Sequence, residues 1–415
     1  MKVLTVLPDI PLPADTGLHL RMLGNLECVR ALGAESFLLC FSTEERIKNL
    51  RLMPEVQLLA DEVIYAGQRK PQSEFTKAEL ARYKLGYLVA GRLGRPSASY
   101  PFAMRYDAVG ACDLVAEEVA RIGADYVVLP SSMIHWAPTL KRAGAQVVAD
   151  AIDVLTDLTR RLMVDVSWGK PGQRLSLAAN YYASRTQERL FLPECVEVWA
   201  TSEGEVQRLR ELSPSTRIVL IPNTVPEPDG DFARAELPRT VGFIGTYSSL
   251  PNARAARHLA EVIFPRVRAA VADSTLMLAG VGLSETDRVR YNGLPGTTVL
   301  GRVESSQQFV ASCSVLALPI RIRGGVTLKL VESLALGRAV VASPEMIAGL
   351  PVSAGTDLVV GNTDDDFASA IVKLLEDDEY RSRIAANGRL AYERHFSRAA
   401  LIKSAKADSI LGEGV

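Results

Sequence analysis

The chain has 415 residues, of which 48% are apolar, and this is enough for two hydrophobic cores rather than one. Its formal net charge of −1 gives no global field that would draw it to nucleic acid or to a membrane. The five cysteines are scattered singly, no apolar run reaches membrane-spanning length, and the start is too short a run for a signal peptide, so we expect a cytoplasmic protein with free thiols.

The beginning of the chain has the pattern of a doubly wound α/β domain. Residues 2–7 form an apolar strand, and a proline-rich loop ending at Gly17 leads into a helix predicted over 18–32. A GxGxxG motif is absent, so the sequence carries no dinucleotide fingerprint. His19 and Arg21 lie at the helix start as acceptor-side candidates, and a plain surface position for Arg21 is equally open.

Residues 69–105, which follow strands predicted at 36–41 and 62–65, differ in character from their surroundings. They hold eight Lys or Arg against two acids, interleaved with Tyr and Leu side chains. Such a basic amphipathic segment can bind an anionic acceptor or touch a membrane surface. The plainer alternative, which we weight more heavily, is a solvated helix with an apolar face toward the core.

Strands predicted at 126–130, 146–149, 197–201 and 217–221 complete the first domain, with helices over 107–123 and 157–192. The carboxyl ends of parallel strands are where such folds bind ligands, and Ser131, Ser132, His135, Asp150 and Asp153 follow two of them. Asp153 can serve as an acceptor-side base with a raised pKa or, equally, as the N-cap of the next helix. A lone histidine such as His135 is more often structural than catalytic.

After Pro222, the sequence PEPDGD predicts a linker, and the strand–helix pattern then restarts. A strand at 240–245 ends in the glycine turn Gly245–Thr246, and a helix is predicted over 253–270. Strands at 275–279 and 298–300 follow, the second closed by Gly301, Arg302 and Val303. We therefore predict an N-terminal domain over 1–222, a linker over 223–239, a second domain over 240–395 and a C-terminal helix within 396–415.

Residues 314–343 carry the clearest site: a strand over 314–320, a loop over 321–327, a helix over 328–336 and a strand over 339–342. The start of a helix presents free N–H groups and the positive end of its dipole. Gly324 and Gly325 let an anion approach the backbone, and Arg321, Arg323 and Lys329 add positive charge. The segment predicts a phosphate or diphosphate site.

Lys329, Glu332 and Ser333 form a polar stripe on an otherwise apolar helix. A carboxylate one turn inside the helix can accept hydrogen bonds from two vicinal hydroxyls, as in a ribose. The alternative, at even odds from the stripe alone, is that the stripe faces water and Lys329 pairs with Glu332.

The segment from Gly324 to Glu332, Gly-Gly-x-x-Leu-Lys-x-x-Glu, and the opening VGFIG-x-Y-x-x-x-PN at 241–252 resemble the nucleotide-sugar site of the retaining GT-B glycosyltransferases of family 4 (glycosyl transferases group 1). The resemblance implies an α/β fold of two Rossmann-like doubly wound domains facing across a cleft, with the donor held by the second domain. It also implies that the last helix packs back on the first domain. Gly324 stands where many members have a first glutamate.

The same resemblance implies roles for individual residues. Glu332 would bind the ribose hydroxyls, and the backbone at Thr327 and Leu328 would hold the diphosphate. His135 stands near the place of a histidine that contacts the donor sugar. The remaining donor-side positions implied are Gly17, Gly245, Thr246, Arg302 and Val303.

The function expected is retaining, metal-independent transfer of a sugar from a nucleoside-diphosphate sugar, with UDP or GDP as the expected nucleotide and no cofactor. The acceptor would be a glycan, a lipid-linked glycan or a small natural product; nucleic acid is not an expected partner, and membrane contact would be at most peripheral, through residues 69–105. Two alternatives stay open: a GT-B nucleotide-sugar epimerase, disfavoured because the chain has four histidines, and a non-catalytic nucleotide-sugar-binding partner. The two Asp-x-Asp matches, at 229–231 and 364–366, lie in a linker and at a helix start, so we predict no metal site.

Overall fold

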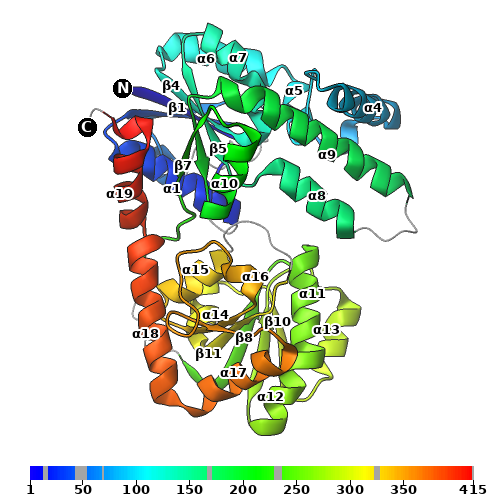
Figure 1. Cartoon of the computed structure of the whole chain (residues 1–415), viewed down its shortest axis with the longest axis vertical. Coiled ribbons are helices and arrows are strands. Elements are labelled where there is room, and N and C mark those ends of the chain that lie inside the picture. The colour runs from blue at the N-terminus through cyan, green and yellow to red at the C-terminus, as the bar shows by residue number, and fades with distance from the viewer. Residues whose placement is uncertain are drawn as a thin grey trace. The chain divides into compact units, whose positions relative to one another are not determined.

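A computed structural model describes residues 1–12, 17–42, 54–67, 70–165, 171–228, 236–321 and 328–413. The chain divides into two compact units (Figure 1). Unit 1 comprises Met1–Pro222 together with Ile402–Val415, and unit 2 comprises Asn223–Leu401. Each unit is an α/β domain built on its own parallel sheet.

The described part of unit 1 contains a seven-stranded sheet in the order β3–β2–β1–β4–β5–β6–β7, and every pairing is parallel. The chain first builds outward from β1 to β3 and then returns to β4 on the other side of β1. The carboxyl ends of β1 and β4 therefore form a topological switch point, where such sheets bind ligands. The strands are β1 (Lys2–Leu7), β2 (Glu35–Cys40), β3 (Glu62–Tyr65), β4 (Tyr126–Pro130), β5 (Gln146–Ala151), β6 (Glu197–Ala200) and β7 (Arg217–Leu220).

The strands of unit 1 are almost continuously apolar, because helices cover both faces of a parallel sheet. Val147, Val148 and Ala149 of β5, for example, have no solvent exposure. The helices of the unit are α1 (Gly17–Ala31), α3 (Pro54–Gln57), α4 (Lys77–Leu93), α5 (Met104–Asp107), α6 (Ala111–Ile122), α7 (Ala137–Arg142), α8 (Leu155–Asp165), α9 (Pro171–Phe191) and α10 (Glu203–Leu212), with short 3₁₀ turns η1 (Gln72–Glu74), η2 (Ser131–Trp136), η3 (Leu192–Glu194) and η5 (Ile410–Gly412).

The helical region expected over 157–192 is two helices, α8 and α9, rather than one. Pro171 has no backbone N–H to donate to a preceding turn, so it stands at the start of α9. Helix α9 packs against both α4 and α8, and the three helices lie together on one side of unit 1 (Figure 1). Among the residues described, the structure contains no helix with both the length and the apolarity needed to cross a bilayer.

The described part of unit 2 contains a six-stranded parallel sheet in the order β10–β9–β8–β11–β12–β13. Its chain path reverses between β8 and β11, which places a second switch point at their carboxyl ends. The strands are β8 (Leu237–Ile244), β9 (Thr275–Ala279), β10 (Thr297–Gly301), β11 (Cys313–Leu318), β12 (Ala339–Ala342) and β13 (Val359–Val360).

The helix expected over 253–270 is a continuous rod of three segments, with a π turn at η4 (Leu259–Ile263) between α11 (Leu250–His258) and α12 (Phe264–Ala270). Pro265 lies just inside α12, where it lacks the N–H of a regular helical turn, and the widened turn precedes it. The other helices of unit 2 are α13 (Glu285–Asn292), α14 (Ser306–Ser312), α15 (Leu328–Ala335), α16 (Pro344–Ile347), α17 (Asp364–Glu376) and α18 (Asp378–His395).

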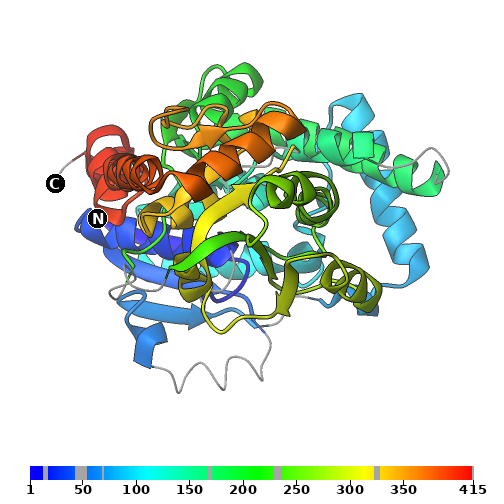
Figure 2. The same cartoon turned by 90° about the horizontal axis from the view of Figure 1, so that it is seen from below.

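The segments expected as the linker and as the C-terminal helix both form hydrogen bonds with the domains. In the segment expected as a linker, the carbonyl of Val225 accepts a hydrogen bond from the Tyr392 hydroxyl at 3.0 Å. Helix α19 (Arg398–Asp408) continues from unit 2 into unit 1. Beyond it, Ser409 donates to Glu197 of β6 at 2.5 Å, so the end of the described chain packs on the unit 1 sheet. Figure 2 shows this red C-terminal segment beside the blue start of the chain.

Candidate functional site

The candidate site lies in unit 2, at the switch point between β8 and β11. Gly245 follows β8 directly, and Lys329 lies in the first turn of α15, after β11. Leu328, the first residue of α15, is half-buried. The loop positions Arg323, Gly324, Gly325 and Thr327 fall outside the described residues, so their predicted contacts stay predictions.

The Lys329 ammonium is held by groups from β8 and α11. Its Nζ donates to Asn252 Oδ1 at 2.7 Å and lies 4.7 Å from the centroid of the Phe243 ring. The Asn252 amide nitrogen donates to the Thr246 carbonyl at 3.0 Å, which turns Oδ1 toward the lysine. Burial lowers the pKa of Lys329 to about 7. An anion near this ammonium would favour its charged form.

Glycines let three strand ends pack together beside Lys329. A side chain at Gly245 would begin 3.0 Å from the Lys329 Nζ, and one at Gly280 would begin 1.9 Å from the Gly245 carbonyl. Gly280 also has a φ of +126°, which other residues rarely adopt. Its N–H donates to the Gly301 carbonyl at 2.7 Å, joining the ends of β8, β9 and β10. Replacement of Gly280 would therefore disturb the floor of the site.

Glu332 lies one turn further along α15 and is half-buried. Its Oε1 accepts a hydrogen bond from the Ser306 hydroxyl at 2.5 Å. Burial raises the pKa of the carboxyl, and the Ser306 hydrogen bond opposes that rise. Lys329 and Glu332 thus have different partners, and the alternative that they pair with each other is not the arrangement in the structure. The second Glu332 oxygen can accept a hydrogen bond from a ligand hydroxyl.

Arg321, expected to bind a diphosphate, is exposed and pairs with an acid of α17. Its Nη2 lies 2.7 Å from Asp364 Oδ1, which is also 2.8 Å from the His258 ring. His258 above all, with Arg321 and Arg266, lowers the pKa of Asp364. The sequence placed Asp364 at a helix start and gave it no metal-binding role. An anion at Arg321 would compete with this carboxylate.

The other donor-side positions lie at the same strand ends. Thr246 and Arg302 are exposed, and Val303 is half-buried after Gly301, whose φ is +71°. Sequence reasoning missed two residues that hold the site, Asn252 and Ser306. Asn252 belongs to the PN pair of the motif at 241–252, so that motif could have indicated it. No sequence pattern around Ser306 indicates its hydrogen bond to Glu332, which lies 26 positions further along the chain.

The unit 1 candidates differ sharply in exposure. Gly17 is the exposed first residue of α1, and His19 is half-buried. Arg21 is buried: its Nε and Nη2 lie 3.1 and 2.6 Å from Asp150 Oδ1, and its Nη1 donates to the Ile221 carbonyl. The expectation of a surface or acceptor-facing arginine is therefore not met, because the guanidinium joins α1 to β5 inside the unit.

His135 and Ser132 lie in η2, just after β4. The Nε2 of His135 lies 3.0 Å from Asp107 Oδ1, and its Nδ1 lies 3.2 Å from Gln187 Nε2. The ring is 7% exposed and packs 4.9 Å from the Tyr100 ring centroid. The Ser132 carbonyl accepts from the same Gln187 amide at 2.8 Å. These contacts account for a structural role of His135; the sugar contact stays a prediction.

Asp153 lies between β5 and α8, with its side chain partly exposed and 3.8 Å from Arg161. Burial raises its pKa, and Arg161 opposes the rise. The N–H groups at the start of α8 are instead capped by Glu188 of α9, whose carboxylate accepts from Leu155 at 2.6 Å and from Thr156 at 3.1 Å. Asp153 is therefore not the N-cap, and its role as a base stays a prediction.

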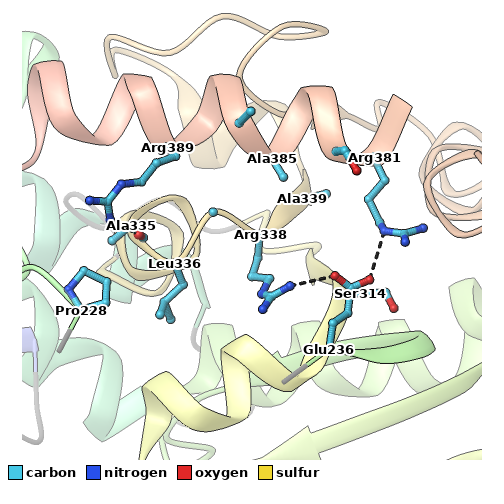
Figure 3. Close-up of a pocket in the computed structure, with 13 residues that line it drawn as sticks. Pro228, Glu236, Ser314, Ala335, Leu336, Arg338, Ala339, Arg381, Ala385 and Arg389 are labelled. Atoms are coloured by element: carbon cyan, nitrogen blue, oxygen red, sulfur yellow. Dashed lines mark hydrogen bonds and ion pairs between the residues drawn. The ribbon is translucent and has the colours of Figure 1, made fainter. Parts of the chain in front are cut away.

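A hollow of about 600 Å³ lies at the opposite edge of the unit 2 sheet, at the amino ends of β11 and β12 (Figure 3). Arg338 and Arg381 both reach Glu236, at 2.7 and 3.2 Å (Figure 3). Arg389, on its rim, pairs with Glu227 at 2.7 Å. An anionic ligand there would have to break these pairs, so the switch point is the better candidate.

Comparison with known proteins finds a family model that matches most of unit 2. Residues 238–377 match the family described as Glycosyl transferases group 1, and that segment contains Gly245, Asn252, Lys329 and Glu332. A GDP-mannose-dependent monoacylated alpha-(1-6)-phosphatidylinositol monomannoside mannosyltransferase of Corynebacterium glutamicum is 30% identical over 144 residues. That match spans 32% of this chain and 38% of the curated relative.

Solved structures match nearly the whole chain. The Anabaena HepE structure in complex with UDP has a TM-score of 0.61 at 14% identity and covers 97% of this chain and 98% of its own. Sucrose-phosphate synthase from Thermosynechococcus elongatus has a TM-score of 0.65 at 16% identity and covers 97% of each chain. At these identities the likeness shows the fold: two parallel α/β sheets with the topology of GT-B glycosyltransferases.

Proposed function

We propose that the protein is a glycosyltransferase that transfers a sugar from a nucleoside-diphosphate sugar bound in unit 2. One observation carries the proposal: Lys329 and Glu332 lie one turn apart on α15, at the sheet's switch point, within the residues that match the Glycosyl transferases group 1 family. The fold of unit 2 supports it, because a helix that begins at a switch point presents its N–H groups to an anion.

The contacts of Lys329 and Glu332 fit a different role for each in the proposed reaction. The desolvated Lys329 ammonium would neutralise charge that develops on the departing diphosphate, together with the start of α15. Glu332, oriented by Ser306, would accept hydrogen bonds from the ribose hydroxyls. Catalysis would then consist mainly of positioning and electrostatic stabilisation. We further propose that the anomeric configuration is retained and that no resident metal is needed.

The proposed donor nucleotide is UDP or GDP. The Corynebacterium glutamicum relative is named for GDP-mannose, and the Anabaena structure contains UDP. The proposed acceptor is a glycan, a lipid-linked glycan or a small molecule, and the relative is named for a phosphatidylinositol mannoside acceptor, which supports the lipid-linked class.

The test is calorimetric titration with UDP, GDP, ADP, dTDP and CDP in the presence of EDTA. We expect one nucleotide to bind, and Glu332→Ala to weaken it about 10- to 100-fold, because hydrogen bonds to a charged group contribute about 1.5–3 kcal/mol. The 2′-deoxy form of that nucleotide should bind wild type more weakly than the ribo form, and Glu332→Ala should lose this preference. Glu379→Ala, at an exposed acid of α18, is the control and should bind as wild type does.

Two results would contradict the proposal in different ways. If none of the five nucleotides binds, the donor site is wrong. If a nucleotide binds through Glu332 but its sugar derivatives are neither hydrolysed nor transferred, the protein is a nucleotide-sugar-binding partner rather than an enzyme.

A further inference from the structure

Helix α4 has two opposite faces, and only one of them is packed. Tyr83, Tyr87 and Gly91 recur every four residues on the inner face. Tyr87 belongs to a buried cluster with Tyr100 and Ala183 of α9, and Tyr83 packs beside it. At Gly91 the two helices come so close that a side chain would begin 2.8 Å from the Tyr182 backbone. This contact fixes how α4 is rotated on α9.

Because of that rotation, the other face of α4 carries apolar side chains into solvent. Leu85, Val89 and Leu93 also recur every four residues, on the face opposite Tyr87. Their exposed fractions are 63%, 50% and 63%. Single exposed apolar residues are common on protein surfaces, but three aligned on one helix mark a contact surface. We call Leu85, Val89 and Leu93 the α4 stripe.

The charge around the α4 stripe is positive. Arg82 lies on the same outer face, and Lys84 and Arg95 are exposed beside it. Arg92 is also exposed, but its guanidinium carbon lies 5.5 Å from the centroid of the Tyr182 ring of α9. Glu79 is the one acid of the helix, and it is held at the N-terminus by the capping box with Thr76 and by Lys70 at 3.0 Å. Within the described ranges, none of Arg82, Lys84 and Arg95 forms an ion pair with a carboxylate. The surface therefore keeps its positive charge for a partner.

We propose that the α4 stripe and its arginines dock unit 1 on an anionic membrane surface. An interfacial helix places its apolar side chains at the level of the acyl chains and its cations among anionic headgroups, and α4 presents both from one outer face. A second copy of this chain fits the surface less well, because a twofold contact would bring the cations around the stripe of one copy against those of the other. This docking does not depend on which nucleotide unit 2 binds.

The experiment is flotation of the full chain with two kinds of vesicle, phosphatidylcholine alone and phosphatidylcholine mixed with an equal part of phosphatidylglycerol. We expect binding to the anionic vesicles and loss of it when salt is raised from about 0.1 M to about 1 M. The variant with Leu85→Gln and Leu93→Gln should bind at least tenfold more weakly, since each leucine contributes apolar burial. Arg82→Gln should weaken binding about fivefold.

The matched control is Val289→Gln, at a valine of α13 in unit 2 that is 65% exposed, and it should float as wild type does. Thermal unfolding and nucleotide affinity of all variants should equal those of wild type, which separates this test from that of the proposed function. Three results would overturn the inference: no binding of wild type, equal binding to both vesicles, or unchanged binding of the Leu85/Leu93 variant. Sedimentation of wild type as a dimer that the same variant dissociates would also overturn it, in favour of a contact between copies.

Discussion

Lys329 is the residue whose charge the surrounding fold controls most directly. Burial lowers its pKa to about 7, so the ammonium loses its proton over the range in which enzymes are usually assayed. A bound diphosphate would stabilise the ammonium and raise that pKa, so binding would take up a proton. We expect nucleotide affinity to fall between pH 7 and pH 9, by at most about tenfold per pH unit. Calorimetry in two buffers with different ionisation enthalpies would show the proton uptake directly.

Two variants of Lys329 test whether its charge causes the expected pH dependence of nucleotide affinity. Lys329→Arg keeps its charge over the whole range, so its affinity should not change with pH above 7. Lys329→Met removes the charge and should bind weakly at every pH. A wild-type affinity that is constant from pH 7 to pH 9 would contradict the role given to this ammonium.

At the scale of elements, two glycines of α4 test how closely this helix packs on α9. Gly91→Ala would place a methyl group 2.8 Å from the Tyr182 backbone and push the helices apart. We expect it to destabilise unit 1 by roughly 1–3 kcal/mol, as overpacking usually does. Unfolding in denaturant, followed by tyrosine and tryptophan fluorescence, would measure the change.

Gly86→Ala is the matched control within the same helix. A side chain at Gly86 meets nothing within 4 Å, and alanine is the better helix former, so this change should stabilise by about 0.5–1 kcal/mol. If both substitutions shift stability in the same direction, the close contact at Gly91 does not decide the packing.

At the scale of the whole molecule, unit 1 includes the C-terminal end of the chain, residues 402–415, although most of the unit comes from residues 1–222. Removing that end tests how much it stabilises unit 1. Glu197 of β6 is fully buried and accepts hydrogen bonds from the Ser409 hydroxyl at 2.5 Å and the Ile410 N–H at 2.8 Å.

Truncation after Leu401 removes both donors and leaves this buried carboxylate with only Trp199 Nε1, at 2.7 Å, and Arg217 Nε, at 3.3 Å, as partners among the described residues. We expect the unfolding midpoint of unit 1 to fall on the order of 10 °C.

Calorimetric scanning can assign the loss to one unit. A nucleotide that binds unit 2 should raise the transition of unit 2, which identifies it. The truncation should lower the other transition and leave the nucleotide-sensitive one in place. A chain that ends after Glu413 keeps these contacts and serves as the control. Equal loss in both transitions would mean that the C-terminal segment does not act through unit 1.

The sequence by itself determined the features that rest on neighbouring residues. β1, β3, β4, β9 and β12 begin and end where the apolar runs predicted. The α/β class followed from their alternation with helices, and the placement of Lys329 and Glu332 one turn apart on one helix followed from their spacing. These patterns are local, because a buried parallel strand and an amphipathic helix each impose their period on adjacent positions.

The tertiary structure decided which side chains meet. Lys329 donates a hydrogen bond to Asn252, 77 positions earlier in the chain, and Arg21 donates one to Asp150, 129 positions later. The outer face of α4 became a contact surface because of how Tyr87 and Gly91 seat the helix on α9. Such partners follow from the order of strands in each sheet and from close packing, and no local pattern of residues encodes them.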